Sequence, residues 1–211
     1  MTRPLLISDC DEVLLHMVAP FKAWLEEDHG VQFNLEGNNF ATALRWASSG
    51  TVLSQDEVWN FLGRFFDTEM YRQKPIEGAV EAINRLSHEA DIVILTNLKD
   101  DRRKKRTEQL AEFGIHAEVF TNQGPKGPAL QGILDKFQPS KAIFIDDLPQ
   151  HHQSASEEVP SVRCLHLCGE PMVARHINCA YKAGHAAARI DIWKEALPWL
   201  LGELKGDSYE Y

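Results

Sequence analysis

The chain has 211 residues, of which 44% are apolar, and its formal net charge is −9. This length suits one α/β domain with an insert, or two small domains, and it can bury an ordinary core without disulfides or metal staples. The negative charge excludes a general electrostatic attraction to nucleic acid polymers or to anionic membranes.

No apolar run reaches the ~18 residues that a transmembrane helix needs. The apolar run near the N-terminus is shorter than that of a signal peptide. Four cysteines fit reduced thiols in a cytoplasmic protein. The sequence does not indicate an oligomeric state.

Apolar runs and helical patterns alternate along most of the chain. This alternation predicts a parallel sheet with helices on both faces. Buried parallel strands are expected at Leu5–Ser8, Ile92–Leu95, Ala117–Phe120, Ala142–Ile145 and Val162–Leu167. Helices are expected over residues 76–89, 100–113, 128–137, 150–158 and 190–204.

Residues 16–74 break this alternation and contain no clear strand. Helical patterns are expected at 20–28, near 40–47 and at 56–71, and the aromatic residues recur at helical spacing. A helical insert directly after the first strand would stand over that strand's end, where it can act as a lid. Candidates for substrate selection in this insert are His16, Arg45 and Arg64.

Asp9 and Asp11 follow the first apolar run, one residue apart. Carboxylates this close raise each other's pKa unless a cation or a proton lies between them. Ligand sites in open parallel sheets lie just outside the carboxyl ends of the strands. Most isolated Asp-x-Asp pairs are helix caps or solvated turns. A catalytic role for this pair therefore needs support from other parts of the chain.

Other polar residues also follow predicted strands. Thr96 and Asn97 follow the second run, and Asp146 and Asp147 follow the run that begins at Ala142. These residues could be helix caps, but two acids after a buried strand favour a metal site. Lys126 lies between glycines and prolines, where a lysine taken alone is typical of a solvated turn.

Taken in this order, the four features resemble the four motifs of the haloacid dehalogenase-like (HAD) superfamily, and the resemblance spans nearly the whole chain. It implies an α/β fold, in which a Rossmann-like parallel sheet flanked by helices carries a small α-helical cap domain. The core domain would comprise residues 1–15 and 76–211, and the cap domain residues 16–75. The implied activity is Mg²⁺-dependent hydrolysis of a small phosphorylated metabolite through an aspartyl-phosphate intermediate.

The resemblance also implies a role for each motif residue. Asp9 would be the nucleophile and a metal ligand, and Asp11 the general acid and base, with its backbone carbonyl also on the metal. Thr96 would bind a phosphoryl oxygen with Asn97 as a helper, and Lys126 would supply positive charge to the nucleophile and the phosphoryl group. The remaining metal ligands would be Asp147 and, directly or through water, Asp146.

The chain departs from the family pattern after the second aspartate, where Glu12 and Val13 replace the common Gly and Thr. Glu12 could point into the site or away from it. The acid at Asp11 disfavours carbon–halogen and phosphonate cleavage. Two alternatives stay open: a phosphomutase, and a non-catalytic protein that binds a phosphorylated ligand.

Three further features have plainer interpretations. Cys164, His166 and Cys168 would share one face of a strand, but their spacing matches no standard zinc motif. His151 and His152 are expected at the surface. The basic run 102–106 is expected to be the solvated start of a helix.

Overall fold

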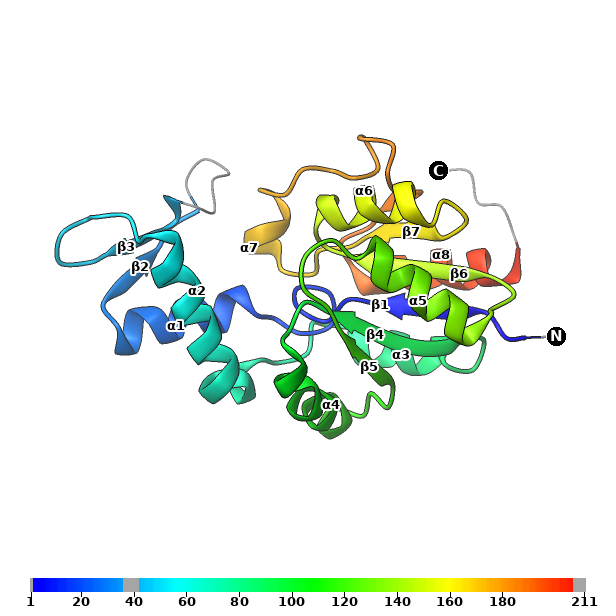
Figure 1. Cartoon of the computed structure of the whole chain (residues 1–211), viewed down its shortest axis with the longest axis horizontal. Helices are drawn as coiled ribbons and strands as arrows, with labels where there is room; N and C mark the ends of the chain where they lie inside the picture. The colour runs from blue at the N-terminus through cyan, green and yellow to red at the C-terminus, as the bar shows by residue number, and fades with distance from the viewer. Residues whose placement is uncertain (1, 36–41, 207–211) are drawn as a thin grey trace.

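A computed structural model describes residues 2–35 and 42–206. Its centre is a six-stranded parallel sheet with the strand order β5-β4-β1-β6-β7-β8 (Figure 1). The strands are β1 Leu5–Ser8, β4 Asp91–Thr96, β5 Glu118–Thr121, β6 Ala142–Asp146, β7 Arg163–His166 and β8 Ala188–Arg189. The sheet confirms the predicted α/β class and the five expected strands, whereas β8 escaped prediction because it has only two residues.

Helices cover both faces of the sheet (Figure 1). Side chains alternate along a strand, so Leu6 packs in one core with α3, α4 and α8, while Leu5 and Ile7 pack in a second core with α5 and α6. The helix bounds are α3 Ala79–Leu86, α4 Arg103–Glu112, α5 Gly127–Phe137, α6 Pro149–Glu158, α7 Pro171–Ala174 and α8 Trp193–Lys205. Among the described helices, none is long and apolar enough to cross a bilayer.

The segment between β1 and α3 forms a separate unit beside the carboxyl edge of the sheet (Figure 1). It contains α1 Val18–Asp28 and α2 Gln55–Arg64, and α2 continues through a π-helical turn at Phe65–Glu69 and a 3-10 turn at Met70–Arg72. A Ser54–Glu57 capping box starts α2. Buried apolar side chains of the unit form one cluster, which also includes Leu98, Cys168, Val173 and Ala174 from outside the unit.

The expected all-helical cap is wrong in one respect, because the unit also contains a two-stranded antiparallel sheet of β2 Val31–Phe33 and β3 Leu44–Trp46. The helix expected near 40–47 is therefore replaced by a strand over Leu44–Trp46, and residues 40 and 41 lie outside the described part. Such three-residue strands are too short to show an alternating pattern. Leu44 is buried, Arg45 is exposed and Trp46 is half-buried.

The two connections between the cap and the sheet run side by side. The backbone amide of His16 donates to the carbonyl of Lys74 at 2.9 Å, and that of Ile76 donates to the carbonyl of Leu14 at 2.9 Å. Leu15 and Pro75 form a bridge between these bonds. The pairing supports the domain division at 1–15, 16–75 and 76–211, which remains a prediction.

Candidate active site

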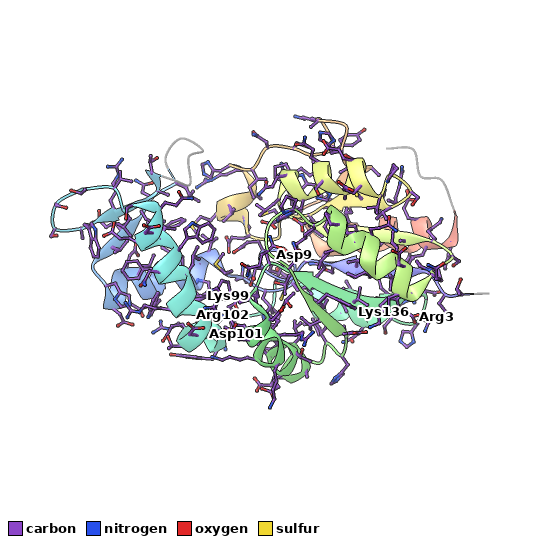
Figure 2. The ribbon with its side chains drawn as sticks, viewed as in Figure 1. Arg3, Asp9, Lys99, Asp101, Arg102 and Lys136 are labelled. Atoms are coloured by element: carbon purple, nitrogen blue, oxygen red, sulfur yellow. The ribbon has the colours of Figure 1, made fainter. Side chains whose placement is uncertain are left out.

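The register of the sheet gathers the predicted site residues at one edge. β1 lies between β4 and β6, and Ser8 is opposite both Ile94 and Ile145. The next residue, Asp9, donates its backbone amide to the carbonyl of Ile145 at 2.8 Å. Asp9 therefore lies beside the ends of two neighbouring strands, at the edge that faces the cap (Figure 2).

Three buried carboxylates lie together at this edge, and two of them contact one buried ammonium group. Lys126 Nζ lies 2.7 Å from Asp9 Oδ1 and 2.6 Å from Asp146 Oδ2. Asp9, Asp146 and Asp147 each offer an oxygen within 4.8 Å of the others. Asp146 also accepts from the backbone amide of Leu148 at 2.8 Å. The structure thus brings together four of the residues that the sequence predicted for catalysis and metal binding.

Burial and neighbouring charges shift the pKa values of these three carboxylates. Burial raises the pKa of Asp9 to about 7, opposed by Lys126 and reinforced by Asp146. Burial, followed by the charges of Asp146 and Asp9, raises the pKa of Asp147 well above its usual range. For Asp146, burial is outweighed by the attraction of Lys126 and His151, so its pKa is lowered. A divalent cation would offset the excess negative charge.

The position of Lys126 depends on the close packing of two helices. Lys126 is the residue before α5, and Gly127 starts that helix. A Cβ atom at Gly127 would lie 2.5 Å from the backbone oxygen of Ser154 in α6, so only glycine allows this approach. The Gly127 amide also donates to Ser154 Oγ at 3.0 Å. This contact fixes the start of α5 and, with it, the lysine.

Thr96 and Asn97 lie at the end of β4 and differ in their contacts. Thr96 is fully buried, and its hydroxyl has no hydrogen-bond partner among the described residues. Asn97 Nδ2 donates to the carbonyl of Gly124 at 3.0 Å, and Asn97 Oδ1 accepts from Asn122 Nδ2 at 3.0 Å. Asn97 therefore holds the loop that carries the lysine, while the Thr96 hydroxyl can still bind a ligand.

The Asp11 side chain does not join the carboxylate cluster. Its Oδ1 accepts from Arg106 Nη2 at 2.9 Å and from Gln73 Nε2 at 2.7 Å. Arg106 is fully buried and also contacts the Cys10 sulfur at 3.1 Å. Sequence reasoning missed Arg106 and Gln73, and the expectation of a wholly solvated basic run is wrong at Arg106. No signal in the sequence separates Arg106 from the four other basic residues of the run.

Glu12 points away from the carboxylate cluster, towards the start of the cap. Its φ of 61° lies in the left-handed region, which is consistent with the glycine usual at this position in the resembled family. Its Oε1 accepts from the backbone amides of Met17 and Val18, at 2.8 and 2.5 Å. Glu12 thereby supplies acceptors to the first turn of α1.

Both histidines after the acidic pair are buried, so the expectation of a surface position is wrong. The ring of His152 bonds to the carbonyl of Asp146 at 2.9 Å, and that of His151 lies 3.4 Å from Asn97 Nδ2. Burial lowers the pKa of both rings. Both histidines therefore pack beside the carboxylate cluster rather than at the surface.

Among the described residues, Cys164, His166 and Cys168 are not part of a group that could hold a metal ion. His166 Nε2 donates to the carbonyl of Asp147 at 2.8 Å, and His166 Nδ1 accepts from the amide of Ala180 at 2.9 Å. Both ring nitrogens are therefore occupied by backbone groups. Cys164 and Cys168 are buried free thiols.

A cavity of about 410 Å³ lies between the cap and the loops that follow β4 and β5. Its volume is within the range of small-molecule sites. Arg45 and Arg64 are not among its lining residues, since Arg45 bonds to the carbonyl of Gly50 and Arg64 lies over Trp24. The lining residues are Trp59, Leu62, Gly63 and Phe66 from the cap, and Asn97, Leu98, Lys99, Arg102, Asn122, Gln123 and Gly124 from the core.

No protein-family model matches the chain, and no curated protein matches it. Several solved structures match the chain. A HAD family hydrolase from Deinococcus radiodurans R1, with bound phosphate and sodium, superimposes with a TM-score of 0.65 at 17% identity, over 97% of each chain. A provisionally assigned phosphoglycolate phosphatase from Lactobacillus plantarum gives 0.62 at 17% identity, over 94% of this chain and 99% of the other.

A provisionally assigned β-phosphoglucomutase from Thermotoga maritima gives a TM-score of 0.61 at 15% identity, over 96% of this chain and 99% of the other. These likenesses confirm that the chain has the fold of HAD-like hydrolases along nearly its whole length. At such identities they show the fold alone, so the chemistry has to be argued from the side chains.

Proposed function

We propose that the protein is a Mg²⁺-dependent phosphatase that hydrolyses a small phosphorylated metabolite through an aspartyl-phosphate intermediate. The observation that carries the proposal is the Asp9 carboxylate, buried and held 2.7 Å from Lys126 beside Asp146 and Asp147. Neighbours of the same fold include one that is provisionally assigned as a phosphatase and one with bound phosphate.

The donor set fits a hard divalent cation. Three carboxylates against one ammonium group leave two negative charges when all are ionised. Oxygen-only ligands suit Mg²⁺, which binds to a few carboxylates and to substrate oxygens. Asp9, Asp147 and, directly or through water, Asp146 would hold the ion together with the backbone carbonyl of Asp11. When bound, Mg²⁺ offsets the negative charge of the phosphate ester.

In the first step an Asp9 oxygen attacks phosphorus, and the bond between phosphorus and the ester oxygen breaks. Lys126 stabilises the phosphoryl charge, and the Thr96 hydroxyl donates to a phosphoryl oxygen. Asp11 gives its proton to the leaving oxygen. Water then hydrolyses the acyl phosphate while Asp11 takes up a proton, which frees phosphate and restores Asp9.

Asp11 must leave its present partners to act in this way. Its carboxylate is held by Arg106 and Gln73, and Gln73 belongs to the segment that returns from the cap. A movement of the cap that draws Gln73 away would remove one of these bonds. We infer that the described arrangement is a resting state in which the acid is withheld from the site.

The cavity between cap and core supports a small organic leaving group. It combines apolar side chains from the cap with the amides and cations that follow β4 and β5. Lys99 and Arg102 lie at its core side, next to the cap (Figure 2). An anionic or polar substrate with an apolar portion fits this lining.

The proposal is tested by phosphate release from a panel of small phosphomonoesters, measured with Mg²⁺ and with EDTA. We expect release that depends on Mg²⁺ and is abolished by EDTA. An isomerised ester in place of free phosphate would identify a phosphomutase instead. Binding of a phosphorylated compound with neither product would identify a non-catalytic binding protein and overturn the proposal.

Thr96→Val should weaken phosphate binding without weakening the fold. The hydroxyl is buried and unpartnered within the described part of the chain, so its loss leaves no protein group unsatisfied. One hydrogen bond to a charged oxygen is worth ~1.5–3 kcal/mol, which corresponds to ~10–100-fold in affinity. The inhibition constant of inorganic phosphate measures this change, and Thr96→Ser is the matched control. Lower stability with unchanged phosphate affinity would show that the hydroxyl is structural.

A further inference from the structure

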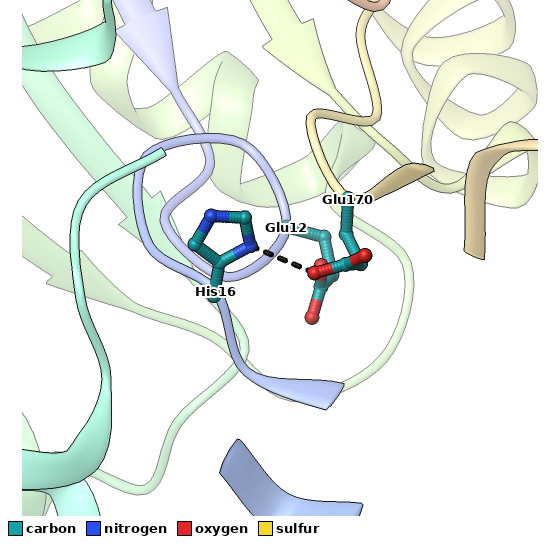
Figure 3. Close-up of side chains that lie close together, drawn as sticks. All are labelled: Glu12, His16 and Glu170. Atoms are coloured by element: carbon teal, nitrogen blue, oxygen red, sulfur yellow. Dashed lines mark hydrogen bonds and ion pairs between the residues drawn. The ribbon is translucent and has the colours of Figure 1, made fainter. Parts of the chain in front are cut away.

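A second cluster of metal-ligating side chains lies outside the carboxylate site, where the chain enters the cap. Glu12, His16 and Glu170 each offer one ligand atom, and the three atoms lie within 4.8 Å of one another (Figure 3). Glu12 and His16 belong to the segment between β1 and α1, and Glu170 is the residue before α7. We call these residues the hinge triad.

The contacts of the hinge triad leave one carboxylate oxygen without a partner. Each glutamate uses Oε1 to accept backbone amides, from Met17 and Val18 for Glu12 and from Met172 for Glu170. Glu170 Oε2 lies 2.8 Å from His16 Nδ1. Glu12 Oε2 has no hydrogen-bond partner within residues 2–35 and 42–206, although Glu12 is only 3% exposed.

The geometry of the two glutamates favours a cation beside them. Figure 3 shows the two carboxylates next to each other, to the right of the His16 ring. Two adjacent buried carboxylates are stable when a proton or a cation lies between them. An unpaired buried oxygen costs ~1–3 kcal/mol, so a ligand at this place is favoured.

We propose that the hinge triad binds a divalent transition-metal ion of the Zn²⁺ type. One imidazole nitrogen and two carboxylates form a mixed donor set that suits Zn²⁺, unlike the all-oxygen set around Asp9. The neutral His16 ring would present Nδ1 to the ion, and a water would complete the coordination. His16 is 28% exposed in its side chain, which gives the ion a path of entry.

The ion would join the first cap linker to the sheet domain. Glu12 and His16 flank that linker, and the carbonyl of Glu12 already accepts from the amide of Gly169 at 2.6 Å. A metal bond to Glu170 would add a second tie between the same two segments. The proposed ion is therefore a structural one that restrains the hinge, and it takes no part in the chemistry at Asp9.

Zn²⁺ binding to the metal-free protein tests the proposal by calorimetry in excess Mg²⁺, with the unfolding temperature measured in parallel. We expect one Zn²⁺ that Mg²⁺ does not displace and that raises the unfolding temperature. Glu170→Gln and His16→Gln should each weaken it by at least the ~10–100-fold that changes to outer-shell partners cost. His16→Gln keeps the test valid if Glu170→Gln fails to fold, because His16 is the more exposed.

Three control variants separate the hinge triad from other sites. His88→Gln removes an exposed histidine, Cys179→Ser removes the least buried thiol, and Asp147→Asn disables the carboxylate site. All three should bind Zn²⁺ as the wild type does. The proposal is overturned if the wild type binds no Zn²⁺, if Glu170→Gln and His16→Gln bind it unchanged, or if any control variant loses it. Because binding is the readout, the result does not depend on phosphatase activity.

Discussion

Replacing Asp9 by asparagine should reduce phosphate release by at least ~10³-fold, because the amide cannot form the acyl phosphate proposed at this position. The fold should persist. An asparagine side chain keeps the shape of the aspartate, and the change removes one of three mutually repelling carboxylates. Lys126 retains Asp146 as its partner at 2.6 Å.

Initial rates on the best ester of the panel measure this effect, and circular dichroism and the unfolding temperature report on the fold. Asp91→Asn is the matched control, since Asp91 is a half-exposed aspartate paired with Arg3 at the opposite end of the sheet. Its rates should equal those of the wild type. Turnover by Asp9→Asn within tenfold of the wild type would contradict the aspartyl-phosphate mechanism.

Replacing Arg106 by methionine should lower the free energy of unfolding by ~3–5 kcal/mol, the usual cost of removing one partner of a buried ion pair. Arg106 is fully buried, and its guanidinium bonds to both Asp11 oxygens, at 2.9 and 3.1 Å. Without it the Asp11 carboxylate, whose side chain is only 16% exposed, keeps Gln73 but loses its cationic partner.

Urea denaturation measures this change, and Arg103→Met is the control from an exposed position of the same helix. The double variant Arg106→Met/Asp11→Asn should recover part of the lost stability, because it no longer contains the unpaired charge. If Arg106→Met is as stable as Arg103→Met, the ion pair with Asp11 is not a significant tie in the folded protein.

The sequence predicted the sheet and its functional edge because buried parallel strands are short apolar runs, and polar residues after such runs are conspicuous. Asp9 and Asp146 were found in this way. The fate of Asp11 could not be found from the sequence, because its partner Arg106 is one of five consecutive basic residues. Only the packing of α4 against the sheet decides which of the five is buried.

Glu12 illustrates a second limit of the sequence. Its direction depends on a positive φ, which a residue pattern does not reveal at a non-glycine position. Its neighbour Glu170 lies far along the chain, in a segment without a legible pattern. The hinge triad, like the Arg106–Asp11 pair, exists only through tertiary contacts, whereas the Asp9 cluster follows from strand ends alone.

The paired cap linkers also bear on how such a protein can diversify. Because His16 bonds to Lys74 and Ile76 to Leu14, the insert leaves the sheet domain at the point where it enters. To the sheet domain the insert is a closed loop, and doubling the length of a loop costs only ~0.6 kcal/mol of closure entropy. Insertions into the parts of the insert that do not contact the sheet domain are therefore thermodynamically cheap for that domain. Changes in the insert can alter substrate preference while the aspartates at the strand ends keep their positions.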